Sequence, residues 1–455
     1  MLIKRGADII AGLILAFFTE FLICNIILQP TDGTDTGLIS FLLFIINTFL
    51  LLYVLANRFK DRRFNSITKT LILGFFFRIA IMLWDVYAQN IYILPNCDAD
   101  ALGYHQTAIS YAFGGRMQSM DWSEYSFYIG RLYRFIGVSK LTLEFLHIFL
   151  AMWAILMIIE IMLRFNLDIK IIKIAVLFLS FLPNLAIITT TTLQEGIIAF
   201  GIVASIYLYT IWFQEKNALY LVLSVFPALA VAFLHMGGLV PIVGFALTLT
   251  FVNNTDRVFK INFSKVFLGL VILIIVLLLI SSNGSTLLRK TGGELSSEAI
   301  VSSTTSPDEA GSADYLNIGI RGLPSSLDLI VNSPIRIIYF VFSPVPWMWR
   351  GINDILAFIG STLFNIYVIA LVIKVFKCGE NHSAKKAYWF VLLAIIFVGI
   401  LMFGWGVSNM GTAIRHREKF TYVFVLLFAF SKQLINDKQI LQTKQNQISE
   451  VRNDT

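Results

Sequence analysis

The amino-acid sequence has few charged residues. Only 14% of its 455 residues are Asp, Glu, Lys or Arg, whereas 57% are hydrophobic, and the mean hydropathy is +0.77. This composition excludes an ordinary soluble globular protein. Apolar runs of roughly 18 to 25 residues recur along the chain, and each is long enough to cross a bilayer as a helix. The sequence therefore predicts an all-α, polytopic integral membrane protein.

Cysteine is also scarce. Cys24, Cys97 and Cys378 fall in an apolar run and in two loops without the spacing of a metal site, so neither a disulfide framework nor a zinc centre is indicated. The sequence also lacks a P-loop, a Rossmann glycine fingerprint, a Gly-x-Ser-x-Gly elbow and a His-Glu-x-x-His helix. Hydrolysis of nucleoside triphosphates is therefore not supported. The formal charge of +7 comes from Lys and Arg in short loops, a pattern of membrane topology and not of nucleic-acid binding.

Basic loops set the predicted orientation. The loop after the second apolar run carries Arg58, Lys60, Arg62, Arg63 and Lys69, which places this loop and the N-terminus in the cytoplasm. The first run lacks a convincing cleavage site and is predicted to be a retained helix. Alternation of loops then predicts about twelve helices in the inner or plasma membrane, with both termini cytoplasmic. The predicted spans are Ile9–Leu28, Leu38–Leu55, Thr70–Tyr87, Leu141–Leu163, Ile174–Ile188, Gly196–Phe213, Ala218–Leu234, Gly238–Val252, Val266–Ile280, Ile355–Ile373, Tyr388–Phe403 and Phe420–Phe430.

The predicted organisation is one integral membrane domain, residues 1–435, followed by a polar cytoplasmic tail, residues 436–455. Two large loops, 88–140 and 281–332, are expected on the outer side. Segment 333–350 is short and interrupted by prolines, so we expect it to be re-entrant or to lie at the interface.

The first outer loop carries an acidic pair ahead of a short helical pattern. Asp98 and Asp100 precede a run in which Leu102, Ile109 and Phe113 repeat at helical spacing, and two glycines end the run. This predicts an amphipathic helix at the outer interface.

Two interpretations of the acidic pair remain open. In one, Asp100 is the N-cap of this helix and Asp98 is solvated. In the other, one carboxylate is a general base and the other orients an acceptor hydroxyl or a phosphate-bound metal, which leaves open a divalent cation at this loop.

Further polar residues could bind substrate. Tyr104 and His105 continue the same helix, and the spacing of Asp100 and Tyr104 places them on one face. His105 could bind a phosphate or a sugar, or lie idle among lipid head groups. Glu195 follows four threonines at the start of a predicted span, where it either stabilises the helix N-terminus or contacts a sugar or an arginine.

Basic residues also lie on the predicted outer side, against the positive-inside pattern. Such cations call for a local anion, for which lipid phosphate, a diphosphate and the acidic outer loops are candidates, with head-group anchoring as the alternative. These residues are Arg131, Arg134, Arg415, His416, Arg417 and Lys419.

Three charged residues are expected inside the membrane. Arg78 and Glu20 are predicted to form a structural ion pair, and Asp85 needs a partner from a neighbouring helix.

Residues 70–209 resemble the C-type integral-membrane glycosyltransferases, the superfamily that uses polyprenyl-phosphate sugars. The resemblance lies in the acidic pair around Ala99, the helix with Tyr104 and His105, the segment YSFYIGRLYRFIG leading into the next span, and the hairpin FLPNLAIITTTTLQEG. It implies that Asp98 or Asp100 is the base acting on the acceptor and that polyprenyl phosphate is the leaving group.

The segment SPVPW and the sequence Arg415-His416-Arg417 instead resemble bacterial surface-polysaccharide polymerases and their relatives. That resemblance implies a polyprenyl-diphosphate donor, also used outside the cytoplasm.

These patterns predict an extracytoplasmic membrane glycosyltransferase of envelope polysaccharide or glycolipid assembly. Its expected partners are a polyprenyl-linked sugar, a glycan or glycolipid acceptor and the bilayer. Cations would stabilise the leaving phosphate, and a carboxylate would take the proton of the acceptor hydroxyl. The alternatives are a repeat-unit polymerase, a flippase or exporter of lipid-linked glycans, and a non-catalytic assembly subunit.

Overall fold

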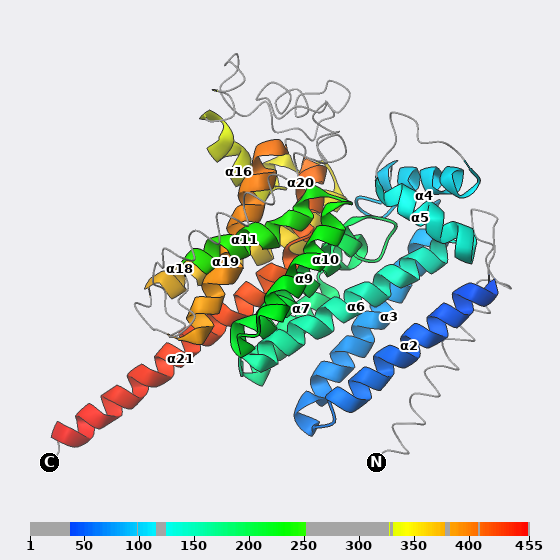
Figure 1. Cartoon of the computed structure of the whole chain (residues 1–455). Coiled ribbons are helices and arrows are strands. Elements are labelled where there is room, and N and C mark those ends of the chain that lie inside the picture. The colour runs from blue at the N-terminus through cyan, green and yellow to red at the C-terminus, as the bar shows by residue number, and fades with distance from the viewer. Residues whose placement is uncertain are drawn as a thin grey trace. The chain divides into compact units, whose positions relative to one another are not determined.

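A computed structural model describes residues 37–97, 99–114, 124–251, 327, 331–377, 383–407 and 410–453 (Figure 1). The regular elements in these residues are helices, as the composition predicts. Five of the helices are long and apolar enough to cross a membrane, which supports membrane character by length and composition. They are Arg62–Tyr87, Lys140–Arg164, Glu195–Glu215, Ile352–Lys377 and Ala384–Gly404.

The predicted number of spans is tested only in part. The first and ninth predicted spans, and most of the loop 281–332, lie outside the described residues. Other apolar helices in the described ranges are shorter than a span, namely Phe44–Arg58, Ala218–Ala232, Met236–Leu249 and Ser333–Phe342. The all-α class is confirmed, and the full count of spans stays a prediction.

The chain divides into two units, which are described separately. The first comprises Met1–Leu156 and Val176–Phe200, and the second comprises Met157–Ala175 and Gly201–Thr455. The helices that contribute to the first unit are α2 (Gly37–Arg58), α3 (Asn65–Tyr87), α4 (Ala99–Ala112), α5 (Glu124–Ile136), α6 (Lys140–Arg164), α7 (Ile169–Phe181), α8 (Pro183–Ile188) and α9 (Glu195–Glu215), of which α6, α7 and α9 also extend into the second unit.

The helices of the second unit after α9 include two short stretches that are not α-helical. A 3₁₀ turn, Met236–Leu239, precedes α11, and a π-helical turn, Phe358–Thr362, joins α17 to α18. The helices are α10 (Ala218–Ala232), α11 (Val240–Phe251), α16 (Ser333–Phe342), α17 (Ile352–Ala357), α18 (Leu363–Lys377), α19 (Ala384–Gly406), α20 (Met410–Glu418) and α21 (Thr421–Asn453).

The fifth predicted span, Ile174–Ile188, is not one continuous helix. It is divided into α7 and α8 at Leu182, whose backbone leaves the helical region at φ −59° and ψ 116°. The residue before a proline is disfavoured in the α conformation, and Pro183 has no N–H to donate. The proline therefore breaks the helix in the middle of the predicted apolar run.

Helices α4 and α5 pack against each other in the first unit (Figure 1). Gly130 allows their close approach, because a Cβ atom there would lie 2.6 Å from Tyr111 Cβ. The helix expected after the acidic pair is thus present, and Gly114 at φ +89° follows its end. Leu102 and Phe113 are exposed. Tyr104 is buried, and so are several alanine and tyrosine side chains of α4.

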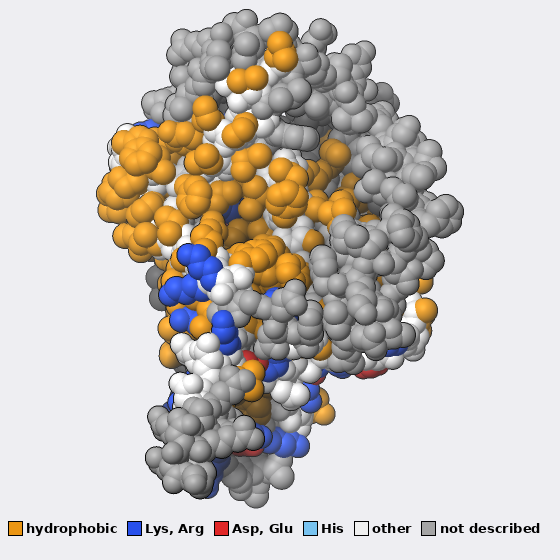
Figure 2. Space-filling model, turned by 90° about the vertical axis from the view of Figure 1, so that its left-hand side faces the viewer, with side chains coloured by type: hydrophobic (Ala, Val, Ile, Leu, Met, Phe, Trp, Pro, Cys, Tyr) orange, Lys and Arg blue, Asp and Glu red, His pale blue; other side chains and the backbone are white. Residues whose placement is uncertain are grey.

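Exposed apolar side chains are frequent on the long helices. On α3, Leu73, Phe76 and Trp84 are exposed, as expected of a helix that meets lipid. Figure 2 shows hydrophobic side chains gathered over a broad face of the molecule. Helix α21 includes most of the last predicted span and continues to Asn453, so the described part of the predicted polar tail is helical.

Candidate functional site

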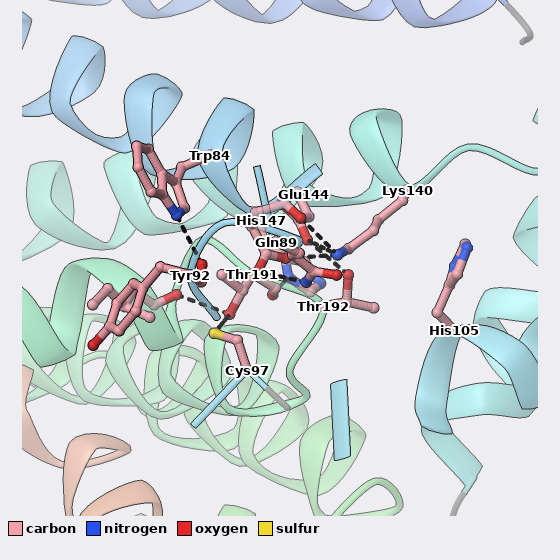
Figure 3. Close-up of polar contacts among 12 residues, drawn as sticks. Trp84, Gln89, Tyr92, Cys97, His105, Lys140, Glu144, His147, Thr191 and Thr192 are labelled. Atoms are coloured by element: carbon pink, nitrogen blue, oxygen red, sulfur yellow. Dashed lines mark hydrogen bonds and ion pairs between the residues drawn. The ribbon is translucent and has the colours of Figure 1, made fainter. Parts of the chain in front are cut away.

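A buried group of ionisable side chains lies where α3 ends and α6 begins, and we call Asp85, Lys140 and Glu144 the acid–lysine cluster. Lys140 Nζ lies 2.8 Å from Asp85 Oδ2 and 3.8 Å from Glu144 Oε1 (Figure 3). The two acid side chains have no exposed surface. Gln89 Nε2 donates to Asp85 Oδ1 at 2.9 Å. Two carboxyl groups therefore meet one ammonium group out of contact with solvent.

The loop between α8 and α9 closes over this cluster. Thr192 Oγ1 donates to Glu144 Oε1 at 2.9 Å, and His147 Nδ1 contacts the carbonyl oxygen of Thr191 at 2.7 Å. A carbonyl can only accept, so His147 carries its proton on Nδ1. Nε2 is then the acceptor for the Tyr125 hydroxyl at 3.2 Å. Glu144 and His147 thus both bind this loop from α6.

The loop before α4 reaches the same place. The Cys97 thiol lies 3.4 Å from Thr191 Oγ1 and is completely buried. Burial raises the pKa of this thiol well above its usual value, and the nearby Asp85 carboxylate raises it further. Cys97 is therefore a protonated, structural thiol directly before the acidic pair.

Helices α4 and α5 are joined to this site by tyrosine contacts. Gln194 Nε2 donates to the Tyr104 hydroxyl at 3.1 Å, and the Tyr104 ring packs edge-on against Tyr125 with centroids 5.2 Å apart. Burial raises the pKa of both tyrosine hydroxyls, so they stay protonated at neutral pH. His105 Nδ1 contacts the Tyr133 hydroxyl at 2.8 Å, and Figure 3 shows His105 apart from the cluster. Tyr104 and His105 are both buried.

The acidic residues singled out in the sequence have different positions. Asp98 lies outside the described residues. Because α4 begins at Ala99, Asp100 lies within its first turn and is not its N-cap. Glu195 is buried in the first turn of α9, where a carboxylate is stabilised by the helix dipole.

Two of the predicted anion-binding arginines have structural contacts. Arg134 donates from Nη2 to the Tyr111 carbonyl at 2.6 Å and from Nε to the Ala112 carbonyl at 3.1 Å. These carbonyls lie at the end of α4, and the Tyr111 carbonyl also accepts from the Gly114 N–H at 3.2 Å. Arg131 lies over the Phe127 ring at 4.3 Å. Arg134 therefore joins α5 to the end of α4, whereas Arg131 packs on a ring of its own helix.

Arg417, in the second unit, is also occupied by the protein itself. It is buried, and its Nη1 donates to the backbone carbonyl groups that end α16. This geometry favours a structural role over phosphate binding. The carbonyl groups are those of Phe340, Val341 and Ser343, and Nη2 contacts the hydroxyls of Ser361 and Thr362.

Two histidines and a lysine surround Phe403 in the second unit. Lys419 Nζ contacts His416 Nδ1 at 2.7 Å, and an ammonium group can only donate, so His416 carries its proton on Nε2. His235 Nδ1 accepts a backbone N–H at 3.0 Å and is likewise a donor at Nε2. The imidazole centroids are 5.0 Å apart. Arg415 and both imidazoles are half-buried, so this group could bind an anion.

The predicted ion pair of Arg78 cannot be assessed, because Glu20 lies outside the described residues. Arg78 is buried and donates to the carbonyl oxygens of Leu179 and Ser180 at 2.9 and 3.0 Å. Its partners in the described structure are therefore backbone carbonyls at the end of α7.

Sequence reasoning did not select Glu144 and His147. The available signal was the segment KLTLEFLH, in which Lys140, Glu144 and His147 are four and then three residues apart and so lie on one face of a helix. Among the described residues, no group of three or more His, Cys, Asp or Glu side chains could hold a metal ion. A cation at the acidic pair stays a prediction, since Asp98 is not described.

Comparison with family models, curated proteins and solved structures finds no match to this chain.

Proposed function

We propose that the protein is a membrane glycosyltransferase that acts on the extracytoplasmic side. It transfers a sugar from a polyprenyl-phosphate-linked donor to a glycan or glycolipid acceptor in envelope polysaccharide assembly. The proposal includes the predicted twelve-span topology with cytoplasmic termini and an outer position for the amphipathic helix α4.

One observation carries the proposal, namely the path of contacts from α4 to the buried carboxyl groups. Tyr104 of α4 accepts from Gln194, which lies two residues after Thr192, and Thr192 donates to Glu144. Helix α4, which is not a candidate span, is therefore connected to a carboxyl group on the candidate span α6 of the same unit. Glycosyl transfer to a hydroxyl needs a proton acceptor of this kind.

The reaction also needs cations, because its leaving group is a phosphate. In the second unit, Arg415 and His416 remain our candidates for binding phosphate. The ring centroid of His235 lies 5.0 Å from that of His416. Arg417 is withdrawn from this role, because its guanidinium group binds the end of α16.

The test is made in cells that carry Asp98→Asn, Asp100→Asn or Glu144→Gln, each with membrane abundance equal to the wild type. We expect loss of polysaccharide or glycolipid and accumulation of a lipid-linked precursor on the outer leaflet. A precursor carrying one sugar supports the single-sugar transferase, whereas a precursor carrying a whole repeat unit supports the polymerase.

Accumulation on the inner leaflet would support a flippase instead. Unchanged glycan in all three variants would reject an acid-dependent transfer reaction in the first unit. Lys170→Met, on the exposed surface of α7, is the control for nonspecific effects of substitution.

A further inference from the structure

The acid–lysine cluster contains two acidic groups and one basic group, so its charges do not balance when all three are ionised. Lys140 Nζ contacts a carboxylate oxygen of Asp85 at 2.8 Å and one of Glu144 at 3.8 Å. One ammonium group balances one carboxylate, so two ionised carboxylates leave a negative charge in a buried place. Uptake of one proton makes the cluster neutral, which is the favourable state in surroundings of low polarity.

Among the described residues, the other groups that face the cluster do not supply the missing positive charge. Gln89 after α3 is neutral, and Cys97 in the following loop is a protonated thiol. On α6, the buried His147 ring contacts the Thr191 carbonyl and the Tyr125 hydroxyl, which are neutral groups, so its surroundings favour the uncharged imidazole.

A hydroxyl group from the loop between α8 and α9 contacts the pair. Thr192 Oγ1 donates to Glu144 Oε1, while Glu144 Oε2 has no hydrogen-bond partner among the described residues. A hydroxyl can receive one proton while it releases another, so it can pass a proton along a hydrogen bond. The buried Thr192 hydroxyl is thus placed to pass a proton to Glu144.

We propose that the paired carboxyl groups of Asp85 and Glu144 are the proton acceptor of the transfer reaction, with Thr192 as the relay. The O–H bond of the acceptor breaks as its oxygen bonds to the anomeric carbon of the sugar. The bond from that carbon to the phosphate oxygen breaks, and the phosphate leaves with the electron pair. The proton passes to the Thr192 hydroxyl, which gives its own proton to Glu144.

This assignment gives the role of base to Asp85 and Glu144 and leaves the acidic pair of the loop the role of orienting the acceptor hydroxyl. Asp100 lies in the first turn of α4, where a negative charge is favourable beside the helix N-terminus. The pair of Asp85 and Glu144 instead moves toward neutrality when it takes the proton. The inference rests on the proposed glycosyltransferase function.

Glu144→Gln tests the proposal with little change of shape. Glutamine resembles the protonated acid and can still accept the hydrogen bond from Thr192, so we expect normal membrane abundance. The rate of transfer should fall by about a hundredfold or more, the usual scale for loss of a general base. Glu160→Gln is the matched control, because Glu160 is on the same helix and pairs with Arg164 at 3.6 Å.

Thr192 allows a second test. Thr192→Val removes the hydroxyl at nearly constant volume and should lower the transfer rate, whereas Thr192→Ser keeps the hydroxyl and should restore it. If valine and serine at position 192 give equal rates, the relay is wrong.

The pH profile separates proton transfer from a purely structural role. In the wild type, the rate should fall toward acidic pH as the carboxyl pair becomes protonated. Glu144→Asp should shift the midpoint of this fall, and the residual rate of Glu144→Gln should lose it. A lower rate in both variants with an unchanged midpoint would mean that Glu144 only maintains the structure.

The outcomes also distinguish the inference from the proposed function. If purified wild-type protein transfers sugar from a polyprenyl-phosphate donor and Glu144→Gln does so equally well, the function stands and the inference fails. If the wild-type protein transfers no sugar from either a polyprenyl-phosphate or a polyprenyl-diphosphate donor, the function fails and the inference with it.

Discussion

Arg78 donates a hydrogen bond to the backbone carbonyl of Leu179, the carbonyl that loses its helical partner because residue 183 is proline. In an α-helix the N–H of residue 183 would bind this oxygen, and proline has none. Arg78 Nη2 lies 2.9 Å from the carbonyl oxygen, and Nη1 lies 3.0 Å from that of Ser180. A buried arginine thus completes the hydrogen bonding at a break in an apolar helix.

The second unit contains the same arrangement. Pro344 cannot donate to the carbonyl of Phe340, and Arg417 Nη1 lies 3.1 Å from that oxygen. Buried backbone carbonyls must find donors, and in lipid no water is available to supply them. The buried side chains of Arg78 and Arg417 therefore complete the hydrogen bonding of broken helices, which favours a structural role for both.

The relation between Arg78 and Pro183 predicts compensation. Arg78→Met should lower the free energy of unfolding in detergent by about 1–3 kcal/mol for each carbonyl left without a donor. In a Pro183→Ala background residue 183 has an N–H of its own, so the same arginine substitution should cost less. A double-mutant cycle by thermal unfolding measures this coupling. Additive effects would show that Arg78 does not replace the missing donor.

Removal of the lysine from the acid–lysine cluster should destabilise the protein strongly. Lys140→Met leaves Asp85 and Glu144 buried together without a cation, at a cost of about 3–5 kcal/mol. Asp85→Asn added to Lys140→Met removes one of the two charges and should recover part of the loss, as measured by thermal unfolding. Lys170→Met on the surface of α7 should change little. A double variant less stable than Lys140→Met would contradict the charge balance.

The two arginines of α5 should differ in their effect on α4. Arg134→Ala removes donors to two carbonyls at the end of α4, at about 1.5–3 kcal/mol for hydrogen bonds to a charged group, reduced by its exposure. Arg131→Ala removes a contact with Phe127 worth about 0.5–1 kcal/mol. Hydrogen exchange in the last turn of α4 should rise more for Arg134→Ala. Equal exchange in the two variants would exclude the capping role.

Arg415 and Arg417 should respond differently to an anion. Pyrophosphate should raise the unfolding temperature of the wild-type protein, and Arg415→Gln should reduce that increase. Arg417→Gln should lower the baseline unfolding temperature and keep the increase, because its side chain binds the end of α16. Arg350→Gln, which breaks a pair with Asp354, is the control.

The opposite result is equally informative. If Arg417→Gln folds with normal stability but no longer responds to pyrophosphate, Arg417 is the phosphate ligand after all. Glu418 lies between Arg417 and Lys419 in the chain. Burial raises the pKa of its carboxyl group, so it is less ionised than a surface glutamate and offsets less of the positive charge around it.

Cys97 should resist alkylation as the pH rises. Its pKa is raised by burial, so the reactive thiolate stays scarce at mildly alkaline pH where an ordinary cysteine is already ionised. In a Cys24→Ser, Cys378→Ser background, a maleimide reagent should label the protein only after denaturation. Rapid labelling of folded protein at pH 8 would show that the thiol is accessible and that the loop before α4 does not bury it.

The sequence by itself determined the class of the protein and several of its elements. Apolar length predicted helices such as α3, α6, α9 and α19, because a run of that length can satisfy its backbone in lipid only as a helix. Local signals also placed α4 between the acidic pair and its terminal glycines. These features depend on the composition of neighbouring residues, which the sequence contains in full.

The candidate site could be predicted only in part. Tyr104 and Glu195 were selected from local patterns, and both lie in the buried part of the first unit. Glu144 was overlooked because its importance comes from Asp85, 59 positions earlier, and from Thr192, 48 positions later. The structural contacts of Arg417 could not be predicted for the same reason, because its carbonyl partners are about 75 residues distant in the chain.

Tertiary structure alone decided which charges are paired. A charged side chain in an apolar run indicates that a partner is needed, but it does not indicate which residue the partner is. Hydrogen bonds act over about 3 Å in space and are independent of separation along the chain. Packing therefore assigned Lys140 to two acids, and gave the guanidinium groups of Arg78 and Arg417 to helices that proline had broken.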